Sequence, residues 1–132
     1  MITLDSIRKP VTAELAAFDE FVERQFTAEG ELLSDMLRYA LSSRGKGIRP
    51  LLVMLSAAMN ASVPGAATGR RACLAAMLVE MIHVASLIHD DVIDEADTRR
   101  GQPSVNARWQ SHKAVILGDY ILARNMAIGL TS

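Results

Sequence analysis

Acidic side chains gather at one point of the chain, directly after a long apolar stretch. Within eight residues the sequence places four aspartates and one glutamate, namely Asp90, Asp91, Asp94, Glu95 and Asp97. A helix that continued through Asp90 and Asp94, four residues apart, would stack their carboxylates on one face. Stacked carboxylates repel each other unless a cation bridges them, and hard oxygen ligands suit magnesium. The simpler alternative is a solvated acidic helix end. We interpret residues 90–94 as an aspartate-rich magnesium motif.

Basic side chains occur in two places that suit phosphate oxygens. Arg99 and Arg100 follow the acidic stretch and supply permanently charged, forked donors. Lys46 and Arg49 belong to a glycine-rich loop, Gly45-Lys46-Gly47-Ile48-Arg49-Pro50, at the expected start of a helix, where backbone amides attract anions. An ordinary connecting loop with solvated charges remains an equally simple interpretation of this stretch.

Two histidines lie on the same expected helix as the aspartates. His83 is seven residues before Asp90, so the two share a face and His83 becomes a possible phosphate donor. A lone histidine on an apolar helix is more often a satisfied core residue. His89 points about 100 degrees away from Asp90, which favours a structural hydrogen bond. For Asp119 an internal or interface hydrogen bond is at least as plausible as a functional role.

Apolar residues recur at helical spacing along nearly the whole chain. The pattern predicts helices over about 11–26, 31–41, 50–59 and 70–94, and a last helix from 106 or 113 to 128. It predicts a loop over 98–104, and no strand stands out. We therefore expect an all-α fold.

Composition limits the classes of function. The 132 residues carry a formal net charge of -1, which argues against nucleic acid as a partner. The single Cys73 cannot form an internal disulfide and fits a buried position in a cytoplasmic protein. The N-terminus lacks the plan of a signal peptide. No uninterrupted apolar run approaches the roughly 18 residues of a membrane span, so we expect none.

Three stretches together resemble the trans-type isoprenyl diphosphate synthases, and in particular the polyprenyl synthases. The resemblance covers about residues 10–130 and includes Gly118-Asp119-Tyr120. The stretches that carry it are the glycine-rich loop, the helix segment Glu80-Met81-Ile82-His83-Val84-Ala85-Ser86-Leu87-Ile88-His89, and Asp90-Asp91-Val92-Ile93-Asp94 running through to Arg99-Arg100-Gly101.

The resemblance implies the N-terminal helices of an isoprenoid synthase (terpenoid synthase-like) bundle, in a cytoplasmic homodimer. It implies a Mg²⁺-dependent prenyltransferase of isoprenoid biosynthesis, which condenses an allylic prenyl diphosphate with isopentenyl diphosphate. By position, Asp90 and Asp94 would be the metal ligands, Asp91 would support them, and Arg99 would contact the allylic diphosphate. The diphosphate of isopentenyl diphosphate would be held by Lys46, Arg49, His83 and Arg100.

The resemblance also bears on product length. Bulky side chains one helical turn below the first aspartate close the cavity floor in this family. Here Ala85 and Ser86 occupy those positions, and both are small. We expect a product longer than fifteen carbons, which Ala85→Phe should shorten.

One departure from the family pattern concerns its second aspartate-rich motif, which these 132 residues lack. We therefore expect a single, incomplete helical domain, the N-terminal half of a polyprenyl synthase, with little or no activity alone. Two alternatives stay open. One is a helical metal phosphohydrolase using His83, His89, Asp90 and Asp119, and the other is a non-catalytic helical subunit that only dimerises.

Overall fold

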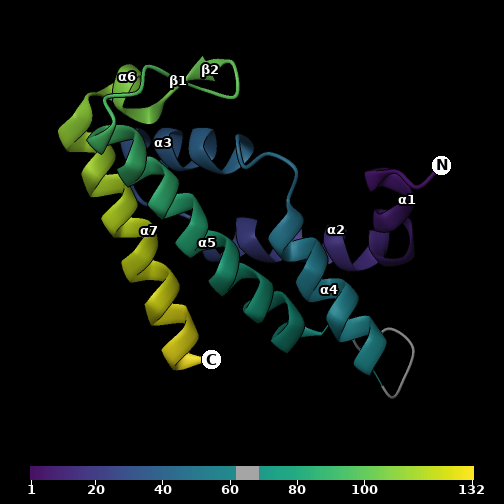
Figure 1. Ribbon diagram of the computed structural model, residues 1–132. Helices are drawn as coiled ribbons and strands as arrows, with labels where there is room; N and C mark the ends of the chain where they lie inside the picture. The colour runs from purple at the N-terminus through teal and green to yellow at the C-terminus, as the bar shows by residue number, and fades with distance from the viewer. Residues whose placement is uncertain (62–68) are drawn as a thin grey trace. The chain divides into compact units, whose positions relative to one another are not determined.

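The computed structural model describes residues 1–61 and 69–132, and helices dominate both parts (Figure 1). This confirms the all-α expectation. The helices are α1 (Leu4–Arg8), the 3-10 turn η1 (Lys9–Val11), α2 (Thr12–Gln25), α3 (Glu31–Ser42), α4 (Ile48–Asn60), α5 (Arg70–Ile93), α6 (Val105–Trp109) and α7 (Ser111–Thr131).

Helix ends fall where the sequence supplies capping residues. Thr3 and Ser6 form a reciprocal capping box at the start of α1. Gly47 takes a left-handed conformation (φ 65°) at the N-cap of α4. Pro50 is the third residue of α4, where a missing N–H costs no helical hydrogen bond. The glycine-rich loop therefore ends as the sequence predicts.

The chain divides into two compact units, each of which is described by itself. The first consists of Met1–Gln25 and Gly47–Glu80. In it α4 packs against α2 and η1. Cys73 is buried as expected, and burial raises the pKa of its thiol, partly opposed by the positive charge of Arg24. The guanidinium carbon of Arg70 lies 5.4 Å from the centre of the Phe21 ring.

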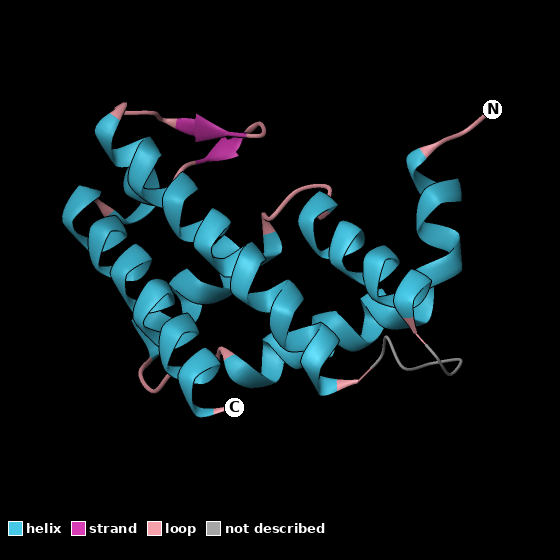
Figure 2. Ribbon diagram, turned by 60° about the horizontal axis from the view of Figure 1, so that its bottom comes forward, coloured by secondary structure: helices cyan, strands magenta, loops and turns pink. Residues whose placement is uncertain are grey.

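The second unit consists of Phe26–Lys46 and Met81–Ser132. It contains α3, residues 81–93 of α5, a short hairpin, α6 and α7. Both views show α7 alongside this part of α5 (Figures 1 and 2). The buried apolar side chains of this unit include Met36, Leu37, Met81, Val84, Ala85, Ile88, Val105, Leu117 and Ile121.

The expected loop over 98–104 proves to contain a two-stranded antiparallel hairpin, drawn in magenta in Figure 2. Strand β1 (Thr98–Arg99) pairs with β2 (Gln102–Pro103), so that Thr98 faces Pro103 and Arg99 faces Gln102. Arg100 and Gly101 join the strands with φ values of 51° and 77°. Positive φ at both central residues is the geometry of a tight hairpin turn whose twist matches the strands. The expectation of no strand was therefore wrong at this place.

The last predicted helix is two helices. Gln110 separates α6 from α7 with φ 80° and ψ 154°, a backbone conformation that only glycine adopts without strain. Ser104 caps α6, and its Oγ accepts a hydrogen bond from the Ala107 amide at 3.2 Å.

By length and composition, α5 and α7 could each cross a bilayer. Scattered polar residues keep the uninterrupted apolar runs of α5 and α7 short, so the search for such runs in the sequence did not reveal a span. The mean hydropathy of each helix is nevertheless high. Core helices of globular proteins pass the same test. The absence of a membrane span therefore stays a prediction.

Candidate functional site

The aspartate-rich motif lies at the C-terminal end of α5. The amide of Asp94 donates to the carbonyl of Asp90 at 2.8 Å, so these two residues stand one turn apart. Glu95 then takes a left-handed conformation (φ 52°) and ends the helix. Its amide donates to the Val92 carbonyl at 3.2 Å, and the Ala96 amide to the Asp91 carbonyl at 2.9 Å. This pair of bonds is the Schellman arrangement that ends many helices.

Asp90 and Asp94 are exposed, and their position is electrostatically unfavourable. The C-terminus of a helix carries partial negative charge, which favours cations and disfavours carboxylates. The last turn of α5 contains no basic residue to compensate. The carboxylates of Asp90 and Asp94 are therefore placed where an added cation gains most.

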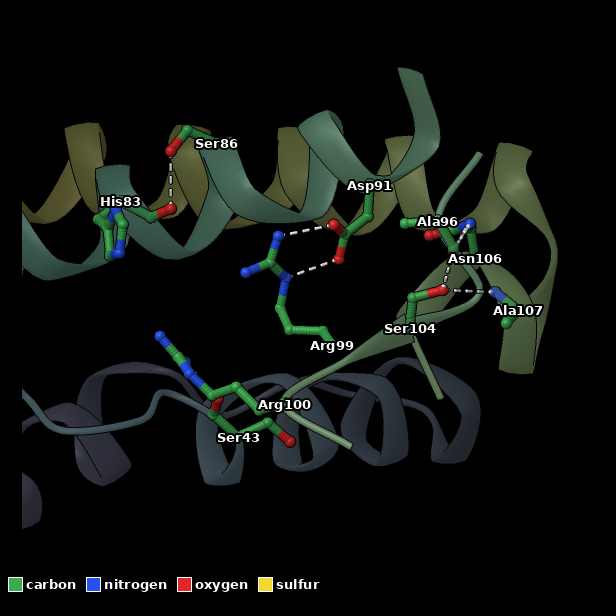
Figure 3. Close-up of polar contacts among 10 residues, drawn as sticks. All are labelled: Ser43, His83, Ser86, Asp91, Ala96, Arg99, Arg100, Ser104, Asn106 and Ala107. Atoms are coloured by element: carbon green, nitrogen blue, oxygen red, sulfur yellow. Dashed lines mark hydrogen bonds and ion pairs between the residues drawn. The ribbon is translucent and has the colours of Figure 1, made fainter. Parts of the chain in front are cut away.

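Asp91 has a different environment from its neighbours. Its side chain is buried and accepts two hydrogen bonds of 2.7 Å each, from Nε and Nη2 of Arg99 (Figure 3). This bidentate fork is the strongest form of an arginine–carboxylate pair. The bond to Asp91 raises the pKa of Arg99, burial opposes the rise, and the charges of Asp91 and Asp90 add to it. Arg99 thus stays charged, with Nη1 directed away from Asp91.

Side chains from α6 tie the base of the hairpin to the end of α5. Ser104 Oγ donates to the Ala96 carbonyl at 2.6 Å, and Asn106 Nδ2 donates to the same carbonyl at 2.9 Å. The Ser104 amide also donates to the Asp97 carbonyl at 2.9 Å. These bonds fix the direction in which the hairpin leaves the helix, and with it the direction of Arg99 and Arg100.

Arg100 lies against the glycine-rich loop. Its Nη1 donates to the Ser43 carbonyl at 3.3 Å. A Cβ atom on Gly45 would overlap the guanidinium group of Arg100, and Gly45 also has φ 85°. The positive φ favours glycine at position 45, and any larger residue there would also displace the guanidinium of Arg100. Lys46 comes next in the chain and is exposed, so the fold brings these two predicted phosphate-binding segments together. Arg49 belongs to the other unit, and its role stays a prediction.

His83 is half-buried on α5, and Figure 3 shows its ring and the guanidinium of Arg100 directed into the space between α5 and the segment that carries Ser43. Ser86 and Ala85, the predicted product-length residues, lie on different faces. Ser86 is exposed one turn before Asp90, and its Oγ donates to the His83 carbonyl at 2.7 Å. Ala85 is completely buried. Ser86 is therefore the residue on the acidic face.

His89 has the structural contacts expected of it. Its Nε2 lies 3.2 Å from the Val115 carbonyl oxygen and 3.4 Å from Oδ1 of Asp119. A Cβ on Gly118 would overlap the imidazole, so α7 approaches α5 closely at this point. The Gly118-Asp119 pair thus contacts His89, and both predictions of a structural hydrogen bond agree with this geometry.

A partly open pocket lies within the same unit. Most of its wall is apolar, and the Asp91–Arg99 pair forms a polar part of it. Its lining includes Tyr39, Val84, Ile88, Asp91, Arg99 and Val105. The pocket adjoins the charged site, because Asp91 and Arg99 line both.

The carboxylates of Asp90 and Asp94 fit a hard divalent ion that takes most of its coordination shell from other ligands. Among residues 1–61 and 69–132, no three His, Cys, Asp or Glu side chains gather closely enough to hold a metal. Asp90 and Asp94 would supply a minority of the ligands, and water and substrate oxygens the rest, which is how magnesium is usually bound beside phosphates.

Sequence reasoning missed the residues that hold the hairpin. Tyr39, on α3, donates its hydroxyl to the Pro103 carbonyl at 2.7 Å, across 64 positions of sequence. Tyr39 does not stand out by type or spacing. Ser104 offers only the general signal that serine often caps the start of a helix, which says nothing about the hairpin.

Packed helices, with two aspartates one turn apart at a helix end and two arginines on the hairpin beyond it, place the described residues in the class of all-helical proteins with an aspartate-rich helix end. Residues 30–131 match the polyprenyl synthetase family, and the chain belongs to that family.

Curated relatives agree with this assignment. The chain is 35% identical over 118 residues to the all-trans-nonaprenyl-diphosphate synthase (geranyl-diphosphate specific) of Rhodobacter capsulatus, covering 89% of this chain and 35% of that protein. It is 40% identical over 113 residues to the nonaprenyl diphosphate synthase of Mycobacterium tuberculosis, covering 86% and 32%. The chain thus spans about a third of the length of these relatives.

Solved structures agree as well. The decaprenyl diphosphate synthase of Rhodobacter capsulatus superposes with a TM-score of 0.81 at 29% identity, over 98% of this chain and 38% of that one. The polyprenyl synthase of Caulobacter crescentus, solved with calcium and isoprenyl diphosphate, also gives 0.81, at 26% identity and the same coverage. These likenesses confirm the isoprenoid synthase fold that the sequence predicts.

Proposed function

We propose that this chain is the diphosphate-binding part of a prenyltransferase. The enzyme condenses an allylic prenyl diphosphate with isopentenyl diphosphate to make a longer trans-polyprenyl diphosphate. One observation carries the proposal: two exposed aspartates are stacked at a helix C-terminus whose last turn holds no basic residue, and Arg99 reaches back from the adjoining hairpin to Asp91 at the same helix end. Negative potential beside fixed cations suits a metal-bound diphosphate.

The allylic diphosphate would bind at the end of α5. Asp90 and Asp94 would hold Mg²⁺, which neutralises charge on the leaving diphosphate and so favours cleavage of the allylic carbon–oxygen bond. Arg99 would donate to diphosphate oxygens mainly through Nη1, because Asp91 takes the Nε–H and one of the two N–H groups of Nη2. Asp91 would then act on the substrate only through Arg99. The calcium and isoprenyl diphosphate bound by the Caulobacter enzyme support a divalent ion at this site.

Isopentenyl diphosphate would bind between the hairpin and the segment Ser43–Lys46. Arg100, Lys46 and His83 would hold its diphosphate. The family resemblance adds Arg49, which belongs to the other unit. The isopentenyl double bond attacks the allylic carbon as diphosphate leaves, one carbon–carbon bond forms, and a proton is lost. Apolar side chains near the site would shield the developing cation from water.

We further propose a cytoplasmic homodimer without nucleic-acid or membrane partners. Large apolar side chains remain exposed on the helices, among them Ile82 at 56%, Ile116 at 61% and Met126 at 63% of full exposure. Apolar faces of this kind are usually covered by further protein. Sedimentation of the purified chain at several concentrations tests the dimer.

The direct test of the site is calorimetric titration of the chain with inorganic pyrophosphate, with and without Mg²⁺. We expect saturable binding only with Mg²⁺. Asp90→Asn or Asp94→Asn should weaken pyrophosphate binding by roughly tenfold or more. Loss of a residue that merely supports a metal ligand already costs about this much, and loss of the ligand should cost at least as much. Asp97→Asn is the matched control, since it removes one charge from the same acidic stretch outside the helix.

Equal losses in all three variants would reduce the effect to net charge and refute the metal assignment. The phosphohydrolase alternative leaves Arg99 and Lys46 without a role. Release of phosphate from nucleotides by the purified chain would favour this alternative. A non-catalytic dimerising subunit predicts no Mg²⁺-dependent pyrophosphate binding at all.

A further inference from the structure

Tyr39 connects the two segments that carry the predicted diphosphate contacts. Its hydroxyl donates to the Pro103 carbonyl in β2 at 2.7 Å. Its ring meets the Trp109 ring edge-on, with centres 5.2 Å apart and planes at 75°. The guanidinium carbon of Arg108 lies 4.6 Å from the Tyr39 ring centre and 4.5 Å from that of Trp109. The Tyr39 side chain is therefore held firmly against the hairpin and α6.

The backbone of the same residue holds the start of the glycine-rich loop. The Tyr39 carbonyl accepts hydrogen bonds from Ser42 Oγ and Ser43 Oγ, both at 2.9 Å. Arg44 Nε adds a bond to the Leu41 carbonyl at 2.9 Å. These contacts turn the chain out of α3 and fix the direction of the loop that leads to Lys46.

Arg100 lies where these two segments meet. It bonds the Ser43 carbonyl at 3.3 Å, and its guanidinium covers Gly45. Arg100 is also in the tight turn of the hairpin, so its position follows any movement of β2. A small shift of Pro103 relative to α3 would therefore move the guanidinium away from the loop.

We propose that Tyr39 is a positioning residue, which holds the Thr98–Pro103 hairpin against the Ser43–Lys46 loop so that Arg100 meets a diphosphate from a fixed direction. Tyr39 acts through Arg100 and does not contact the substrate. The proposal rests on the proposed function, because it concerns the diphosphate that Arg100 would bind.

The test compares two tyrosine-to-phenylalanine variants of the whole chain. Tyr39→Phe keeps the ring contacts and removes only the hydroxyl bond to Pro103. Tyr120→Phe is the matched control, since its hydroxyl donates to the Thr27 carbonyl at 3.4 Å in the same unit. In titrations with inorganic pyrophosphate and Mg²⁺, Tyr39→Phe should bind measurably more weakly, by up to roughly tenfold, because one neutral hydrogen bond is worth at most about that factor and its loss reaches the ligand only through Arg100. Tyr120→Phe should match the unmodified chain.

A double-mutant cycle separates positioning from general stability. In an Arg100→Gln background, Tyr39→Phe should cause no further loss of pyrophosphate affinity, because the arginine that it positions is gone. The urea midpoint of each variant shows whether it is folded under the binding conditions. If Tyr39→Phe lowers pyrophosphate affinity equally in the Arg100→Gln background, Tyr39 does not act through Arg100, and the proposal is overturned.

The outcomes also separate this proposal from the proposed function. If the unmodified chain binds pyrophosphate and the Tyr39→Phe variant binds it equally tightly, only the positioning role is overturned. An unmodified chain that does not bind pyrophosphate with Mg²⁺ would overturn both.

Discussion

The three carboxylates of the aspartate-rich motif differ in burial and therefore in their surroundings. Asp90 and Asp94 face solvent, whereas Asp91 is turned inward against Arg99. A buried carboxylate needs a partner that satisfies its lone pairs, and the forked guanidinium does so. The motif therefore contains its own support: one aspartate holds the arginine that accompanies the other two.

Neutralising these aspartates one at a time should change stability in opposite directions. Without metal, we expect Asp91→Asn to lower the free energy of unfolding by roughly 1–3 kcal/mol, because it leaves Arg99 without its ion pair. Arg99 is partly exposed, which favours the lower end of this range. Asp90→Asn should raise stability slightly, since it removes a charge from the negative end of α5. Urea unfolding without Mg²⁺ measures both, and equal losses would contradict the division of roles.

The two small residues before the motif should respond differently to enlargement. Ala85 is completely buried, so Ala85→Phe should cost about 1–3 kcal/mol or more through overpacking. Ser86 is exposed on the acidic face, and Ser86→Phe should leave the unfolding free energy within about 0.5 kcal/mol. Thermal unfolding of the two variants tests this. A cost as large for Ser86→Phe would mean that position 86 is packed.

Among the elements, the hairpin has the largest effect on the site and was the least predictable. Its strands are two residues long, too short for the alternation that identifies a strand. Its turn is Arg100-Gly101, and asparagine or aspartate before the glycine is the usual signal. Long apolar helices such as α5 were predictable, and so were the stacking of Asp90 and Asp94 and the helix end near them.

Contacts between distant parts of the sequence explain the rest of what was missed. Helical periodicity shows which residues share a face, but it does not show what that face meets. The pairing of Asp91 with Arg99 crosses the end of a helix, and the bond from Tyr39 to Pro103 joins α3 to a hairpin. The family resemblance assigned Arg100 and Lys46 to the same diphosphate, and the structure places Arg100 against Gly45, the residue before Lys46.

The break between α6 and α7 should be a source of strain. Gln110 has φ 80° and ψ 154°, which costs a side-chain-bearing residue about 1–3 kcal/mol. We expect Gln110→Gly to raise the free energy of unfolding by roughly 1 kcal/mol, after the greater chain entropy of glycine is subtracted. Gln110→Ala is the control and should give no such gain. Chemical denaturation of the three proteins distinguishes them.

At the scale of the whole molecule, the chain contains one aspartate-rich motif and spans about a third of its relatives' length. We expect the 132-residue chain alone to show little or no chain elongation, because two aspartates leave most of a metal's shell to other ligands. Incubation with labelled isopentenyl diphosphate, an allylic diphosphate and Mg²⁺ measures this, and sustained turnover would contradict it. Substrate binding without turnover is the expected result.

The contact of Trp109 with Tyr39 and Arg108 has a practical consequence. Trp109 is the chain's one tryptophan, so intrinsic emission excited at the indole band comes from a single known place beside the hairpin. The protein thus contains a natural optical probe, and ligand-induced changes near the arginine pair can be followed by fluorescence without any attached dye.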